Sequence, residues 1–183
     1  MKKLPIILLI SLAFIIGIGA NIFINSSGEP QIAESLSESV MDLPFMIENR
    51  GKVSLKDIEF KEMLIINFWA SWCEPCKKEI PELNSFNESL DKDNNIRLIG
   101  VAIDDINEVM SFTKEIPISY SNLTDEKNGF LLSRHFDNDK GVLPFTVVVD
   151  KSYQVLHKFY GEITEKDLLN VVKFGKLVFY CRD

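Results

Sequence analysis

Two cysteines three positions apart lie within "FWASWCEPCKKEIPEL", residues 68–83. Cys73 and Cys76 follow an aromatic, β-branched run typical of a buried strand, and they open a stretch in which apolar residues keep helical spacing. Such a pair can supply half of a metal site, form a structural disulfide or exchange disulfides with other proteins. The choice among these three chemistries decides what the sequence predicts about function.

A metal site fits the sequence poorly. Zinc normally takes four ligands in a closed tetrahedral set, and the further candidates, His135, His157 and Cys181, match no ligand spacing. Covalent haem attachment requires histidine directly after the second cysteine, where this chain has Lys77. Flavin, nicotinamide and phosphate motifs are absent as well. We therefore expect no metal and no cofactor, two structural histidines, and a spare thiol at Cys181.

A redox pair fits better than a structural disulfide. A bridge within one helical turn closes a very small loop, so it restricts the unfolded chain little. A cysteine at a helix N-terminus, in contrast, lies beside free backbone N–H groups and the positive end of the helix dipole, which favour the attacking thiolate. We expect Cys73 to attack a partner's disulfide and the more buried Cys76 to resolve the mixed disulfide.

Three neighbours of the cysteines support this interpretation. Pro75 suits a first helical turn, where its missing N–H is not needed. Trp72 is expected to place an apolar wall beside the sulfur of Cys73. Glu74 favours the helix N-terminus but opposes a thiolate at Cys73, so the thiol should be less acidic than in a strong oxidant. That property would suit a reductase.

Strand-like and helix-like runs alternate around the motif. Strands are expected at 63–69, 96–103 and near 118–124, and helices at 73–90, 107–116 and 126–136. The runs 145–150 and 153–161 are typical of a hairpin, and a helix over 164–176 follows, with Thr164 as N-cap and Asp167 three residues on. This order predicts an α/β fold with a mixed central sheet flanked by helices.

The N-terminal residues carry a membrane signal. After two lysines, residues 4–24 contain no charge, and a stretch of this length can cross a bilayer as a helix. Ala20 offers only a weak cleavage site and apolar residues continue beyond it, which favours a retained anchor over a cleaved signal peptide. The lysines would stay cytoplasmic, and the rest of the chain would face the other side of the membrane.

The remaining segments and the charge complete this organisation. Residues 25–39 are serine-rich and acidic, which is typical of a polar tether. We expect one folded domain over 40–179 and a short tail at 180–183. The net charge of −7 argues against nucleic-acid binding, which needs a basic face.

The motif and its surroundings resemble a known family. "NFWASWCEPCKKEIPEL" resembles the active-site segment of the thioredoxin superfamily, and more narrowly that of the TlpA/ResA/DsbE (CcmG)-type membrane-anchored proteins of bacteria. The resemblance covers residues 42–176 and includes "GVAIDD" and "GVLPFTVVVD". It implies a thioredoxin-like fold with an N-terminal hairpin at 42–57 and a central insertion at 107–136, preceded by one transmembrane helix.

The resemblance also implies roles for individual residues. Pro144 in "LPFT" matches the family's cis-proline, which faces the redox pair, and Leu143 beside it would help to bind an extended substrate chain. Thioredoxin has a buried aspartate at the position of Asn67, whereas this branch instead carries a glutamate at the position of Glu79. Glu79 would assist proton transfer to or from Cys76, although by itself such a helix glutamate is typically solvated.

The implied function is an extracytoplasmic thiol–disulfide oxidoreductase that reduces protein disulfides, with cytochrome c maturation and copper-site assembly as typical tasks of the branch. It would act at the bacterial inner (cytoplasmic) membrane, with its catalytic domain facing the periplasm or the outside. The implied partners are a disulfide-bearing protein substrate and a transmembrane electron-donor protein, because the compartment has no glutathione-like pool by default.

Three alternatives stay open. A disulfide oxidase or isomerase uses the same residues at a different potential, and 30 mV corresponds to about 1.4 kcal/mol for a two-electron couple. A non-catalytic binding module would use the fold only for docking, although both cysteines, Trp72 and Pro144 are retained. A peroxiredoxin-like peroxidase has threonine three positions before a single attacking cysteine, where this chain has Ala70.

Overall fold

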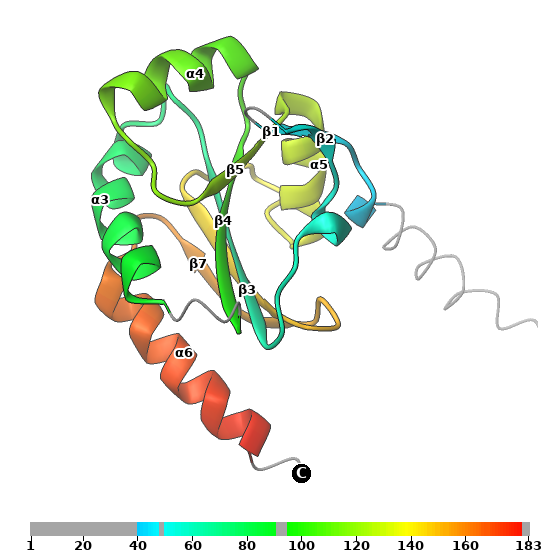
Figure 1. Cartoon of the computed structure of the whole chain (residues 1–183), viewed down its shortest axis with the longest axis vertical. Coiled ribbons are helices and arrows are strands. Elements are labelled where there is room, and N and C mark those ends of the chain that lie inside the picture. Colours follow the sequence, from blue (N-terminus) through cyan, green and yellow to red (C-terminus); the bar gives the residue numbers. More distant parts are fainter. Residues whose placement is uncertain (1–39, 48–49, 91–94, 181–183) are drawn as a thin grey trace, which may run out of the picture. The chain divides into compact units, whose positions relative to one another are not determined.

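A mixed β-sheet forms the centre of the fold. The computed structural model describes residues 40–47, 50–90 and 95–180, with side chains up to residue 174. They belong to the compact unit Ser39–Asp183, and within them a seven-stranded sheet has the order β2-β1-β5-β4-β3-β6-β7 (Figure 1). The strands are β1 (Phe45–Ile47), β2 (Gly51–Val53), β3 (Met63–Trp69), β4 (Ile96–Ala102), β5 (Ser121–Thr124), β6 (Phe145–Asp150) and β7 (Val155–Tyr160).

Strand direction divides the sheet into a parallel centre and antiparallel flanks. β3, β4 and β5 run parallel to one another. β6 and β7 on one side, and β1 and β2 on the other, run antiparallel to their neighbours. The predicted mixed sheet and the N-terminal hairpin are therefore confirmed. β3 is buried at every position, as expected for a strand covered on both faces.

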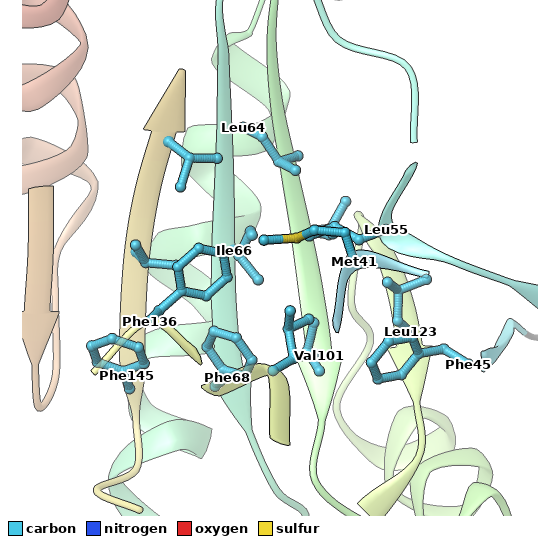
Figure 2. Close-up of a cluster of buried hydrophobic side chains, with 14 of the residues drawn as sticks. Met41, Phe45, Leu55, Leu64, Ile66, Phe68, Val101, Leu123, Phe136 and Phe145 are labelled. Carbon is cyan, nitrogen blue, oxygen red and sulfur yellow. The ribbon is translucent and has the colours of Figure 1, made fainter. Parts of the chain in front are cut away.

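Helices cover both faces of the sheet. They are a 3-10 turn (Leu55–Asp57), α3 (Glu74–Ser89), α4 (Ile106–Glu115), α5 (Glu126–His135) and α6 (Glu165–Tyr180). Because side chains alternate along a strand, Leu64, Ile66 and Phe68 of β3 pack on one face with Phe136, which follows α5 (Figure 2). Met63 and Ile65 pack on the other face with α3 and α6. The predicted α/β sandwich is confirmed.

Two element boundaries differ from the sequence prediction. β5 begins only at Ser121, because the residues before it bond to α3: Asn84 Nδ2 donates to the carbonyl of Pro117, and the N–H of Ser119 donates to Asn84 Oδ1. α6 continues to Tyr180 instead of ending at residue 176. Its predicted start is confirmed, since Thr164 Oγ1 and N–H both donate to Asp167 Oδ2, at 2.6 and 2.9 Å.

The predicted membrane segment lies outside the described residues, as do the tether at 25–39 and Cys181. Among the residues that the structure does describe, none of the helices has both the length and the apolar character needed to cross a bilayer.

Candidate functional site

Cys73 and Cys76 lie where β3 leads into α3. Cys73 is the N-cap of α3, and its Sγ accepts a hydrogen bond of 3.3 Å from the N–H of Cys76. The two residues form a disulfide with their Cα atoms 5.3 Å apart. Cys73 keeps 4% of its surface exposed and Cys76 none. The predicted pairing, the position at the helix N-terminus and the deeper burial of Cys76 are all confirmed.

Apolar packing holds this turn in place. Both cysteines belong to a buried cluster with Trp69 of β3 and with Val109 and Phe112 of α4. The indole of Trp69 lies 5.0 Å from the ring of Phe112, and its Nε1 donates to Asn122 Oδ1 at 2.9 Å. The end of β3 is therefore fixed from two sides, and so is the turn that presents Cys73.

The loop before β6 lies against the same cluster. The Leu143–Pro144 peptide bond is cis, as the family resemblance implied. Leu143 packs against the cluster that contains the disulfide. The carbonyl of Pro144 accepts a hydrogen bond of 2.9 Å from the N–H of Gly161. The structure thus brings Leu143 to the cluster that contains the redox pair, and Pro144 follows it in the chain.

Glu79 is buried, which corrects the expectation from the sequence alone that this glutamate is solvated. Its exposed fraction is 2%, because α3 turns this face toward the sheet. Asn67 Nδ2 donates to Oε1 at 2.7 Å, and the N–H of Ile163 donates to Oε2 at 3.1 Å. Burial raises the pKa of Glu79 to about 7, even though these two hydrogen bonds favour the carboxylate.

Polar side chains surround this carboxyl in the layer between α3 and the sheet. Asn67 Nδ2 also donates to Thr146 Oγ1 on the neighbouring strand at 2.9 Å. Asn67 Oδ1 and the hydroxyl of Tyr120 are buried and have no hydrogen-bond partner in the described part of the chain. Burial, and next the charge of Glu79, raise the pKa of Tyr120. Compared with water, this buried site therefore stabilises the neutral carboxylic acid of Glu79 relative to its carboxylate.

The other predicted neighbours lie at the surface. Trp72 directly precedes Cys73 and is 67% exposed, and the apolar wall expected beside the sulfur stays a prediction. Glu74 is exposed, and its Oε2 lies 3.3 Å from Nζ of Lys77. The opposing charge that we expected near Cys73 is thus partly neutralised. Pro75 lies in the first turn of α3, as predicted.

Asp104 is a site residue that sequence reasoning missed. It is 8% exposed, and its Oδ2 accepts both the N–H of Ser71 at 2.9 Å and the hydroxyl of Ser71 at 2.6 Å. Ser71 lies two residues before Cys73, so Asp104 fixes the start of the active-site turn. Asp104 lies two residues after the end of β4, which runs parallel to β3, and the carboxyl ends of adjacent parallel strands meet at one edge of a sheet. The sequence "GVAIDD" contained this signal, because it places an acid just after a predicted strand.

The histidines lie in two different elements. His135 ends α5, where burial lowers its pKa, and its ring packs on Phe136 at 5.2 Å. His157 lies on β7 with its ring 4.4 Å from that of Phe159. Among the residues with described side chains, no three His, Cys, Asp or Glu side chains are grouped so that they could hold a metal ion.

Comparison with known proteins identifies the family. Residues 39–166 match the AhpC/TSA family. The chain belongs to the AhpC/TSA family. Among curated members, the thiol-disulfide oxidoreductase ResA of Bacillus cereus is 29% identical over 118 residues, 64% of this chain and 65% of that protein. The thiol:disulfide interchange protein DsbE homolog of Paracoccus denitrificans is 30% identical over 125 residues, 66% of this chain and 64% of the relative.

A solved structure supports the same assignment. The thioredoxin-related protein from Neisseria meningitidis serogroup B is 30% identical, with a TM-score of 0.61 over 70% of this chain and 94% of that one. The chain spans slightly less than two thirds of the length of both curated relatives. The resemblance to ResA/DsbE-type proteins and the thioredoxin-like fold are confirmed, and the names of these relatives agree with the predicted class of activity.

Proposed function

We propose that this protein reduces disulfides in other proteins through the Cys73–Cys76 pair, on the extracytoplasmic side of a bacterial membrane. The observation that carries the proposal is the disulfide at the N-terminus of α3, with Cys73, which keeps 4% of its surface exposed, as N-cap and the fully buried Cys76 behind it. The relatives named thiol-disulfide oxidoreductases support the same class of reaction.

In the first step, the reduced protein acts through the thiolate of Cys73. The free N–H groups at the start of α3 and the helix dipole favour this thiolate. Its sulfur attacks one sulfur of the partner's disulfide and forms a mixed disulfide, while the partner's other sulfur leaves as a thiolate and takes a proton from solvent.

In the second step, Cys76 releases the partner. The thiol of Cys76 gives its proton to the carboxylate of Glu79, three residues further along the same helix face. The new thiolate attacks the sulfur of Cys73, which forms the intramolecular disulfide and releases the partner's second sulfur as a thiolate that takes a proton from solvent. Two electrons pass from the dithiol to the partner. A carboxyl with a pKa near 7 is suited to this transfer, because it both accepts and returns a proton at neutral pH.

Two surface features are proposed to hold the partner. The backbone at Leu143 and Pro144 pairs with an extended segment of the partner next to its disulfide. The exposed ring of Trp72 covers apolar surface of the partner beside Cys73. Neither contact depends strongly on the partner's sequence.

The proposed location follows from the uncharged stretch 4–24, which acts as a retained membrane anchor with residues 25–39 as tether. A transmembrane electron-donor protein then returns the pair to the dithiol, because the outer compartment supplies no thiol pool by default. Apocytochrome c cysteines and copper-site assembly proteins are the proposed substrates.

Insulin reduction by dithiothreitol, with the full-length chain in detergent micelles, tests the proposal. We expect the chain to accelerate insulin precipitation and Cys73→Ser to abolish this effect. Cys181→Ser is the matched control, since it removes a cysteine outside the proposed pair, and it should retain the rate. Equal rates with Cys73→Ser and the unaltered chain would contradict the proposal.

A further inference from the structure

The connection between α5 and β6 contains a buried asparagine. Residues 136–144 join the two elements, and we call them the α5–β6 loop. Asn138 of this loop is 1% exposed. A buried side-chain amide needs hydrogen-bond partners for both its oxygen and its NH2 group, because water does not reach it. The partners of this amide therefore show which part of the loop it holds.

The amide of Asn138 bonds both main-chain groups of Val142. Its Oδ1 accepts the N–H of Val142 at 3.0 Å, and its Nδ2 donates to the carbonyl of Val142 at 2.9 Å. The same Nδ2 donates to Oγ of the buried Ser133 in α5 at 2.8 Å. The N–H of Asn138 donates to the carbonyl of Ser133 at 3.2 Å. Asn138 thus ties Val142 to α5, and its side chain replaces the main-chain partner that a neighbouring strand would supply.

The backbone of the α5–β6 loop depends on such contacts, because it is irregular. Asp137 and Gly141 have φ angles of 68° and 60°, in the left-handed region that residues with a side chain seldom adopt. A Cβ at Gly141 would lie 3.0 Å from the ring of Phe130 in α5, so the loop packs closely on this helix. The N–H of Gly141 donates to the carbonyl of Asn138 at 3.0 Å. Asn138 therefore holds the loop at both ends of this turn.

The residue that Asn138 bonds lies directly before the segment proposed to hold the partner. Both polar main-chain groups of Val142 are bonded to Asn138. Pro144 has no N–H, and its carbonyl accepts the N–H of Gly161 at 2.9 Å. Within residues 142–144, these contacts leave Leu143 to exchange main-chain hydrogen bonds with a bound chain.

We propose that Asn138 is a positioning residue that determines where the partner's main chain pairs beside Cys73. This inference rests on the proposed function, because it concerns the segment that holds the partner. Asn138 bonds Val142 and so places Leu143, which packs against the cluster that contains the disulfide, for pairing with an extended segment of the partner. Asn138 affects how the partner is held and leaves the reactivity of the Cys73 thiolate unchanged.

Two disulfide probes separate these two effects. In both, a cysteine is joined through a disulfide to nitrothiobenzoate. The cysteine is a single blocked residue in the small probe and the centre of a nonapeptide in the peptide probe. The thiolate of Cys73 bonds to the sulfur of the probe's cysteine, the disulfide of the probe breaks, and nitrothiobenzoate leaves as a coloured thiolate. The initial rate of its release is measured with the reduced full-length Cys181→Ser chain in detergent micelles.

Main-chain pairing should make the peptide probe the faster one. We expect it to react at least about tenfold faster than the small probe, because pairing holds its disulfide beside Cys73. A third probe carries N-methyl groups on alternate backbone amides of the same nonapeptide, which removes pairing, and it should react at about the rate of the small probe.

Substitution of Asn138 should remove this preference. Asn138→Ala should slow the peptide probe by at least about fivefold, the effect of losing a hydrogen bond of ordinary strength. It should change the rate of the small probe by less than about twofold, because the cysteines are unaltered. The matched control is Asn84→Ala. Asn84 also donates to one main-chain carbonyl and accepts one main-chain N–H, but in the segment 117–119. Both of its rates should stay within about twofold.

A second variant keeps the test decisive if Asn138→Ala does not fold, which circular dichroism in increasing urea shows. Asn138→Asp retains the size of the side chain and the oxygen that accepts the N–H of Val142, but its carboxylate cannot donate to the carbonyl of Val142. It should slow the peptide probe by at least about threefold relative to the small probe. A folded Asn138 variant that keeps the full preference for the peptide probe, or that slows both probes equally, would overturn the proposal.

The remaining outcomes distinguish this inference from the proposed function. If the chain reduces insulin but reacts equally fast with the peptide probe and the small probe, main-chain pairing fails, and the inference fails with it, while disulfide reduction stands. If the probes and the Asn138 variants behave as expected but the chain does not reduce insulin, the proposed function fails instead.

Discussion

The side-chain amide of Asn67 on β3 donates a 2.7 Å hydrogen bond to the carboxyl of Glu79 on α3. The contact joins the centre of the sheet to the helix that carries both cysteines. Glu79 lies three residues after Cys76 and is held from its other side by the N–H of Ile163. A carboxyl with a pKa of about 7 is thereby fixed in the interior, on the helix face below the redox pair.

Glu79 should make the stability of the fold depend on pH. Its pKa is about 7 in the folded state and 4.5 without the fold, so between these values the folded protein binds more protons than the unfolded one. The free energy of unfolding should therefore fall as pH rises from 4.5 through 7, by on the order of 3 kcal/mol. Urea unfolding of the unaltered chain and of Glu79→Gln at pH 5 and pH 8 measures this.

Glu79→Gln should remove most of that decrease, because a glutamine does not titrate. Glu88→Gln, at the exposed end of the same helix, is the control and should keep it. If the chain and Glu79→Gln lose equal stability between pH 5 and pH 8, Glu79 is ionised in both states and the proposed proton transfer loses its basis.

Asn67 should tune the activity through Glu79. Asn67→Ala removes a donor that favours the carboxylate, so the pKa of Glu79 should rise above 7. Release of the partner from the mixed disulfide needs the carboxylate, and the pH at which this step is half-maximal should therefore move upward. Rapid-quench measurement over pH 5–9 tests this, with Thr146→Val as a comparison that leaves the Asn67–Glu79 bond in place. An unchanged midpoint would contradict the assignment.

Asp104 should stabilise the active-site turn. Asp104→Ala leaves the N–H of Ser71 without its acceptor and should lower the free energy of unfolding by about 1–3 kcal/mol. Asp104→Asn keeps an acceptor oxygen and should cost less. A double-mutant cycle with Ser71→Ala should give a coupling energy of about 0.5–3 kcal/mol, whereas additive effects would show that the contact contributes little.

The ion pair between Glu74 and Lys77 should adjust the reactivity of Cys73. Glu74→Gln removes a negative charge near the attacking sulfur and leaves that of Lys77, so the thiolate should be favoured. Alkylation of the reduced protein by iodoacetamide at pH 6 should become about two- to fivefold faster, in line with the small energies of exposed pairs. Lys77→Gln should slow it. Equal rates in all three proteins would remove this argument.

Local pattern predicted most of the fold. The buried strand at 63–69 and the helix that starts after Cys73 follow from β-branched runs and helical spacing within a few residues. The cis-proline at 144 came from the family resemblance, since spacing alone does not distinguish cis from trans. The start of β5 was missed because Asn84, distant in the sequence, bonds the backbone at Pro117 and Ser119.

The chemistry of the site was harder to predict than the cysteine pair. Periodicity does not show whether a helix glutamate faces solvent, and Glu79 is buried only because its partners on β3 and before α6 lie there in the fold. Asp104 and Ser71 are 33 residues apart in sequence, and their contact requires β3 and β4 to be adjacent. Such long-range polar contacts depend on topology, which the local pattern does not contain.

The central claim is that Cys73 and Cys76 cycle between dithiol and disulfide. Equilibration of the Cys181→Ser chain with reduced and oxidised glutathione, followed by alkylation and mass measurement, tests this most directly. The account predicts one two-electron transition in which both thiols appear and disappear together, and its loss in Cys73→Ser. A pair that stays oxidised or stays reduced over the whole range of glutathione ratios would contradict it.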